Sequence, residues 1–128
     1  MFSRVLIAAA GLVIGTWPSA AAAMAVKFSW TGYPACSTAS PAFTIEDVPA
    51  GTKRLDFKMV DRDVPTYPHG GGSVAYDGGR EIRAGAFSYQ GPCPPAGQRH
   101  GYEWTVRALD ENGKAIASAT ASATFPPL

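Results

Sequence analysis

Glycine and proline interrupt this sequence so often that long helices are excluded from most of it. The chain of 128 residues has 14 glycines and 11 prolines, and beyond Trp30 one of them recurs every few positions. Neither residue suits the middle of a regular element, since glycine is too flexible and proline lacks an N–H donor. No apolar pattern with the helical period runs for long between them. The spacing therefore predicts short strands joined by turns.

The first part of the chain differs and has the layout of a secretory signal peptide. Arg4 supplies a positive charge, an apolar run of about ten residues follows it, and small residues lead up to Ala23. A membrane span needs about twenty apolar residues, so we expect no transmembrane anchor. We predict a signal peptide over residues 1–23, cleaved after Ala23 or, as a second choice, after Ala25. Residues 24–128 then form a single secreted or periplasmic domain.

The charge balance excludes two classes of partner. The chain has 11 lysines and arginines against 10 aspartates and glutamates, without a cluster of basic residues. Proteins that bind nucleic acid or anionic membrane surfaces carry a basic face. We therefore expect neither nucleic acid nor an anionic membrane surface as a partner.

Cys36 and Cys93 are the two cysteines of the chain. In an oxidising compartment, two cysteines and no third predict one disulfide with a single possible connectivity. Closing a loop of this length stabilises a fold by about 4 kcal/mol in the chain-entropy description. Two unpaired, buried thiols are the alternative.

Alternation of apolar and polar residues marks the strands. It is clearest where Leu55, Phe57 and Met59 alternate with more polar neighbours, and again from Tyr102 onward. The segment after the Asn-Gly turn at 112–113 could be helix or strand, and its threonines favour a strand. We predict an all-β, mainly antiparallel sandwich without a C-terminal helix. Its strands are predicted at 26–30, 42–45, 55–60, 74–76, 81–83, 102–109 and 114–125, with 74–76 and 81–83 forming a hairpin around Asp77-Gly78-Gly79.

Two of these strands have apolar faces that turn polar at one end. The face of Leu55 continues to Asp61 and Asp63, and the face of Trp104 runs back through Tyr102 to His100. A buried carboxylate needs partners, and a histidine beside a carboxylate has its charged form stabilised and can donate to an anion. If the two ends meet, they form a small anion pocket. A surface turn with solvated acids is the alternative.

Two loops flank these strand ends. Pro65 holds its predecessor extended, and His69 then precedes a glycine run that we expect to be flexible. The second loop, Gly91-Pro92-Cys93-Pro94-Pro95, is dense in proline and is therefore stiff, which favours a shaped wall beside a ligand. A plain crossover loop is the other interpretation.

These motifs together resemble the phosphatidylethanolamine-binding protein family, which includes Raf kinase inhibitor protein. The resemblance covers roughly residues 36–110. Its segments are Ser40-Pro41-Ala42-Phe43, Val48-Pro49-Ala50-Gly51-Thr52-Lys53, Asp61-Arg62-Asp63-Val64-Pro65, and Gly91-Pro92-Cys93-Pro94-Pro95 with Gly97, His100 and Tyr102.

The resemblance implies a β-sandwich with a pocket for phosphate-like or carboxylate groups, including phospholipid headgroups. Members bind ligands or modulate kinases and proteases and are not known as enzymes. The chain departs from the family at Arg62, where proline is usual, and at His69, which comes early and precedes Gly70 instead of tryptophan. A shorter loop implies a more open pocket. The expected ligand-binding residues are Asp61, Asp63, Pro65, His69, Gly91, Pro94, His100 and Tyr102.

Three functions are compatible with the sequence. The first is an exported protein that binds a small anion or phospholipid headgroup, without a metal or other cofactor and without enzymatic activity. The second is a secreted inhibitor or interaction protein whose pocket is vestigial. The third is an enzyme or metal protein that uses His69, His100 and the two acids, although their spacing is unlike that of a compact zinc site.

Overall fold

The computed structural model describes residue 5, residues 7–16 and residues 22–128. Arg4 and part of the small-residue segment of the predicted signal peptide lie outside the described residues. The described chain contains seven strands and no helix, which confirms the prediction of an all-β fold. It thus has no helix of a length and apolarity that would cross a membrane.

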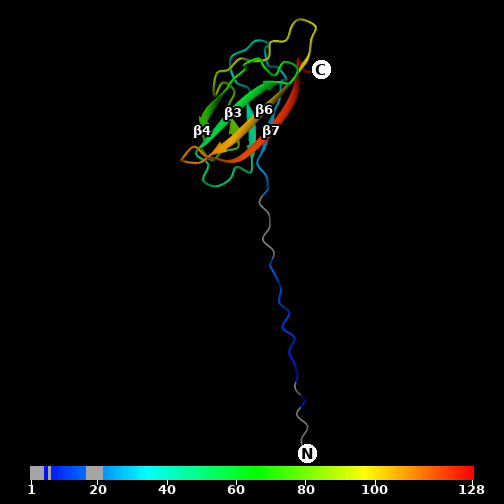
Figure 1. The fold of residues 1–128 in the computed structure, drawn as a ribbon, viewed down its shortest axis with the longest axis vertical. Coiled ribbons are helices and arrows are strands. Elements are labelled where there is room, and N and C mark those ends of the chain that lie inside the picture. The colour runs from blue at the N-terminus through cyan, green and yellow to red at the C-terminus, as the bar shows by residue number, and fades with distance from the viewer. Residues whose placement is uncertain (1–4, 6, 17–21) are drawn as a thin grey trace, which may run out of the picture.

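The strands form two antiparallel sheets, and the larger one faces the reader in Figure 1. The smaller sheet has the order β1-β2-β5 and the larger one the order β4-β3-β6-β7. The bounds are β1 Ala25–Phe28, β2 Phe43–Glu46, β3 Arg54–Asp61, β4 Gly71–Ala75, β5 Glu81–Ile82, β6 His100–Leu109 and β7 Ala115–Phe125. The ambiguous last segment is therefore a strand.

The core lies between the sheets and is largely aromatic. Leu55, Phe57 and Met59 of β3 are at most 2% exposed, as their alternation predicted. The ring of Phe43, from the smaller sheet, lies 4.8 Å from the ring of Phe57 and 5.1 Å from that of Trp104. Each such side chain, when fully buried, contributes about 1.5–3 kcal/mol to the free energy of unfolding.

The predicted hairpin between 74–76 and 81–83 is wrong. In the structure β4 pairs with β3, and β5 pairs with β2. The turn at 77–79 carries the chain from one sheet to the other. Turn residues specify a bend but not the partner of each strand, which depends on contacts with distant segments. Ile82, for example, lies opposite Phe43.

The glycine run expected to be flexible is instead the start of β4. Gly71 lies opposite Lys58, and Gly72 lies opposite Phe57. A Cβ atom on Gly71 would overlap the carbonyl oxygen of Phe57, and one on Gly72 would lie 2.5 Å from the Cβ and Cγ atoms of Phe87. These glycines therefore permit a close approach that any side chain would block.

We predict that Gly72→Ala lowers the free energy of unfolding by about 2 kcal/mol, because the added methyl group displaces Phe87 from the core. Gly101→Ala is the matched control, since a Cβ at Gly101 has its nearest neighbour at 3.9 Å. The free energy of unfolding of this control should lie within about 0.5 kcal/mol of the wild-type value. Urea unfolding of the oxidised proteins checks both values, and equal stability of the two variants would contradict the prediction.

Candidate functional site

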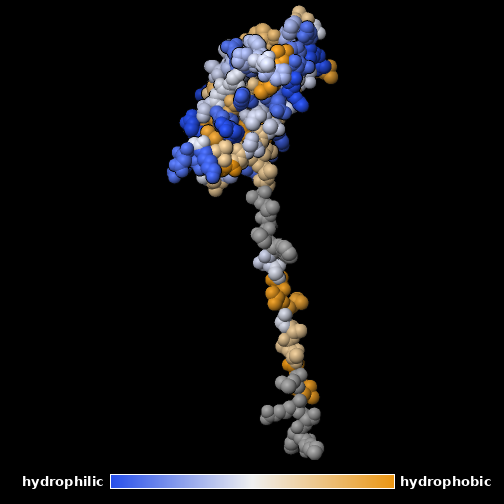
Figure 2. Space-filling model, in the orientation of Figure 1, coloured by the Kyte–Doolittle hydropathy of each residue, from blue (hydrophilic) through white to orange (hydrophobic). Residues whose placement is uncertain are grey.

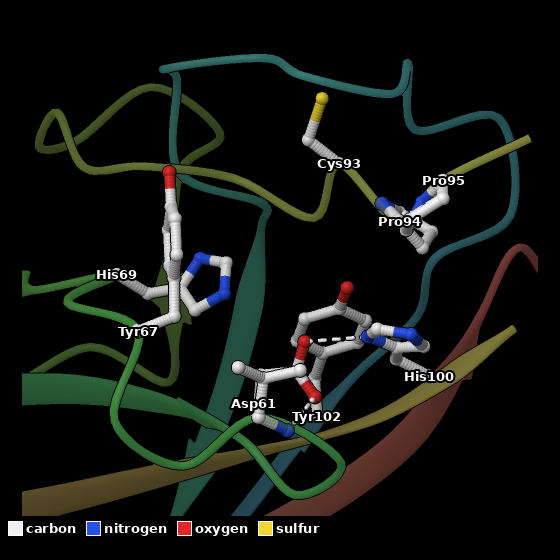
Figure 3. Close-up of a pocket in the computed structure, with 9 residues that line it drawn as sticks. Asp61, Tyr67, His69, Cys93, Pro94, Pro95, His100 and Tyr102 are labelled. Atoms are coloured by element: carbon white, nitrogen blue, oxygen red, sulfur yellow. Dashed lines mark hydrogen bonds and ion pairs between the residues drawn. The ribbon is translucent and has the colours of Figure 1, made fainter. Parts of the chain in front are cut away.

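A pocket of about 240 Å³ lies where β3 ends and β6 begins (Figure 3). The strands supply its floor, the loop after β3 supplies one wall, and the proline-rich loop before β6 supplies the other. A cavity of this size fits a small headgroup and not a drug-sized molecule. The lining residues are Asp61, Val64, Tyr67, His69, Cys93, Pro94, Pro95, His100 and Tyr102.

An ion pair between Asp61 and His100 lies at the floor of the pocket. The His100 Nδ1 atom lies 2.7 Å from Asp61 Oδ2, with His100 only 12% exposed at its side chain. The other ring nitrogen, Nε2, lies 3.1 Å from Gln98 Oε1. Both ring nitrogens thus lie within hydrogen-bond distance of an oxygen atom, so the ring is held on both sides.

Asp61 is 4% exposed, yet it is kept ionised by its partners. Burial by itself raises the pKa of this carboxyl group. The hydrogen bond from His100 and the backbone N–H groups of Asp63 and Val64 outweigh burial and hold the pKa below its usual value. Asp61 Oδ1 accepts both N–H groups, at 2.9 and 3.1 Å. Every partner therefore favours the charged form.

Tyr102 and His69 offer polar atoms to the interior of the pocket (Figure 3). Burial, followed by the negative charge of Asp61, raises the pKa of the Tyr102 phenol, so its hydroxyl stays a donor at neutral pH. His69 Nδ1 lies 2.5 Å from the carbonyl oxygen of Gln90 and donates to it. That bond fixes the ring, and His69 Nε2 makes no hydrogen bond within the described part of the chain.

The proline-rich wall is tied to the rest of the fold by the predicted disulfide. Cys36 and Cys93 are bonded, across a sequence separation of 57 residues. Two backbone hydrogen bonds support the same contact, from Cys36 N to Pro92 O at 2.8 Å and from Gly91 N to Ser37 O at 2.9 Å. The loop that carries Pro94 therefore has little freedom to move away from the pocket.

Five of the eight predicted ligand-binding residues line the pocket, and three do not. Asp63 is exposed, because β3 ends at Asp61 and the chain turns away, so the expected buried pair of acids does not form. Asp63 instead accepts the N–H of Gly101 at 2.7 Å. Pro65 is exposed within the same turn. The residues that line the pocket are Asp61, His69, Pro94, His100 and Tyr102.

Gly91 is buried and supports the wall from behind. A Cβ atom there would collide with the carbonyl oxygen of Ser37, so the position requires glycine for close packing of two loops. Its effect on the pocket is therefore indirect, through the loop that it anchors.

Sequence reasoning missed Val64, Tyr67 and Pro95 as lining residues. Val64 and Tyr67 are 41% and 50% exposed, large values for apolar side chains. Tyr67 packs against His69, with ring centroids 4.6 Å apart and the ring planes tilted by 52°. The sequence does place Val64 and Tyr67 in the same loop as His69, and this proximity could have indicated that they line the pocket.

One cluster of side chains at the site has the composition of a metal-binding group. Asp61, Asp63 and His100 offer ligand atoms that lie within 4.8 Å of one another. All three already form hydrogen bonds within the protein, and His69 is not part of this group. These hydrogen bonds by themselves explain why the two carboxylates lie close together.

Comparison with known proteins finds a curated relative and solved structures of similar fold. No protein-family model matches the chain. The Escherichia coli K12 protein YbhB, of the group UPF0098, is 37% identical over 94 residues, which cover 56% of this chain and 60% of YbhB. The chain thus spans less than two thirds of this relative.

The solved structures agree in fold. A putative phosphatidylethanolamine-binding protein homologue from Chlamydia trachomatis superposes with a TM-score of 0.60 at 20% identity, covering 83% of this chain and 99% of its own. The Escherichia coli protein YbcL is described as a new member of the mammalian family of these proteins. It superposes with a TM-score of 0.56 at 19% identity, covering 81% of this chain and 98% of YbcL. With the motifs around Asp61 and His100 in place, the chain has the fold of these phosphatidylethanolamine-binding protein homologues and resembles them in sequence at the site.

Proposed function

We propose that the protein binds a small oxyanion, either free phosphate or the phosphate of a headgroup, in the pocket between Asp61 and Tyr67. One observation carries the proposal. Tyr102 directs a hydroxyl donor into the small cavity, and the free Nε2 atom of His69 in the same cavity can accept a hydrogen bond from a protonated phosphate oxygen while Nδ1 donates to Gln90. The carboxylate of that cavity is occupied by internal hydrogen bonds.

The Asp61–His100 ion pair is compatible with anion binding, although Asp61 is negatively charged. Asp61 Oδ1 is occupied by two N–H groups and Oδ2 by His100, so the carboxylate is neutralised by donors. His100 carries a compensating positive charge when it is protonated, but both of its ring nitrogens already face Asp61 and Gln98, so it acts on an anion through its charge and not through a free N–H. We infer that Asp61 is a positioning residue, which orients the ring of His100.

The same geometry favours a binding protein over an enzyme. The ring of His69 is fixed through Gln90, and that of His100 through Asp61 and Gln98, and no serine or cysteine thiol lies beside either ring in the lining set. A nucleophile within hydrogen-bond reach of a base would be needed for covalent catalysis.

We predict that Tyr102→Phe weakens the binding of inorganic phosphate and of phosphoethanolamine by about five- to tenfold, the loss of one net hydrogen bond. Tyr89→Phe is the matched control, because the Tyr89 hydroxyl is bonded to that of Tyr33 at 2.9 Å and lies outside this pocket. Titration followed by the ring signals of His69 and His100 in NMR spectra measures both affinities.

The two ligands separate the possible sources of the anion. Tighter binding of phosphoethanolamine would favour a headgroup, and equal binding would favour the phosphate alone. Unchanged histidine signals at millimolar concentrations of either ligand would reject the proposed function and favour an interaction protein with a vestigial pocket.

We predict that Asp61→Asn lowers the free energy of unfolding by about 1–2 kcal/mol at neutral pH. The folded-state pKa of Asp61 is lowered from 3.8, so its stabilisation is fully present above that pH and is lost as the pH falls through the folded value. The difference in the free energy of unfolding between wild type and variant should therefore shrink as the pH falls below about 4. Urea unfolding across this range measures it, and a difference that stays constant with pH would contradict the assignment.

We also propose that the chain is exported, with residues 1–23 as the signal peptide. The described residues of that segment extend away from the domain (Figure 2) and are apolar yet exposed, with Ile7 at 87% and Val13 at 93%. An apolar segment outside the core is suited to recognition by an export system. The disulfide fits an oxidising compartment.

The structure favours cleavage after Ala23 over cleavage after Ala25. Met24 is 7% exposed in the core, and Ala25 pairs with Glu46 at the start of β1. A cut after Ala25 would remove both contacts. We therefore predict that the N-terminal sequence of the protein recovered from the periplasm or medium begins at Met24, and a mature chain that begins at Val26 would contradict this.

A further inference from the structure

Strand β7 is an edge strand that lacks the usual protection against pairing. It spans 11 residues, Ala115–Phe125, and none of them is charged or proline. The other edges of the two sheets are short, with four residues in β1, five in β4 and two in β5. Natural edges are blunted by shortness, charges, proline or bulges. Along β7 the one irregularity of register lies at its start, beside Ala108 and Leu109.

The unpaired backbone groups of β7 follow from the pairing of its neighbour. Arg62 N donates to Gly101 O, so the backbone groups of Gly101 face β3 and those of Tyr102 face β7. Tyr102 lies opposite Ala123. The inner alanines of β7 therefore pair with β6. The groups that point away from the sheet belong to Ile116, Ser118, Thr120, Ser122 and Thr124.

The sequence of this edge is symmetric about its centre. Residues 117–123 read Ala-Ser-Ala-Thr-Ala-Ser-Ala in either direction, with Thr120 in the middle. If two copies pair antiparallel about a two-fold axis at Thr120, Ser118 lies opposite Ser122 of the second copy. Each position then meets an identical residue type, as a self-complementary two-fold interface requires.

We propose that β7 pairs with β7 of a second copy of this chain, which joins the two larger sheets into one eight-stranded antiparallel sheet. The residues with free backbone groups then face each other, so both strands exchange N–H···O bonds along the seam. The side chains of Ser118, Thr120 and Ser122 are all exposed on one face and continue that face across the seam. The pair of Thr120 side chains on the axis is of a kind that stabilises strand pairing.

Two further features favour a second copy over an unrelated strand. The seam contains no charged residue, so like charges do not oppose each other across the axis. Ile116 is 39% exposed, the one large apolar residue of the described strands that is exposed, and in this register it faces the methyl group of Thr124. A foreign strand would match neither the symmetry nor this contact.

The pairing leaves both pockets accessible. His100 lies opposite Phe125, at the end of β7, so each pocket lies near one end of the seam. Phe125 and its equivalent in the second copy lie ten residue steps apart along the seam, about 34 Å at 3.4 Å per residue. Two anion sites would thus lie at opposite ends of one sheet.

The first test is the state of association of the oxidised protein, measured by sedimentation at increasing concentration. We expect a reversible monomer–dimer equilibrium. Thr120→Glu places two acids opposite each other on the axis and should raise the dissociation constant at least about tenfold. Ala75→Glu, at the exposed opposite edge of the same sheet, is the matched control and should leave it unchanged. Circular dichroism verifies that both variants are folded.

The second test is the register, measured by electron spin resonance distances between nitroxide labels on Ile116→Cys or on Thr124→Cys. An axis at Thr120 makes both distances equal, about 27 Å between Cα atoms, because each position lies four residues from the axis. Unequal distances would overturn the register. A monomer at all concentrations, or a dimer that Thr120→Glu does not weaken, would overturn the proposal.

Discussion

The pairing of β3 with β6 is the interaction on which the core and the pocket both depend. Its register runs without a break from Arg54 opposite Leu109 to Asp61 opposite Tyr102. A slip by one residue would turn every side chain of one strand to the other face. The apolar residues at one end and the Asp61–His100 pair at the other therefore hold the register together. The pocket is a continuation of the core, in which polar partners replace apolar contacts.

This continuity explains how much of the site could be predicted from the sequence. Period-two alternation is a local property, and it identified the faces that carry Asp61, His100 and Tyr102. It also placed the apolar core of β3 and β6. It failed at Asp63, because alternation holds only while the chain stays extended and β3 ends two residues earlier. Asp63 then acts on the backbone of β6 and not in the pocket.

The errors in the fold concern pairings between distant segments. The Asp77-Gly78-Gly79 turn has the composition of a hairpin, yet it joins two sheets, because the choice of partner depends on contacts far along the chain. Likewise, glycines at 71 and 72 have the composition of a flexible loop. Their role as a strand becomes evident only when Phe57 and Phe87 occupy the space that a side chain would need. The composition of a segment indicates which backbone conformations it can adopt, and tertiary packing determines which of them it adopts.

Gly101 links the pocket to the free edge of the sheet. Its N–H is held by Asp63 and its carbonyl by Arg62, so its backbone groups are directed toward β3. The neighbouring residue, Tyr102, must then bond to β7 while its side chain lies in the pocket. One local arrangement at the end of β3 thus determines which groups line the pocket and which groups of β7 remain unpaired. A change at Asp63 would disturb both surfaces, although Asp63 itself lies in neither.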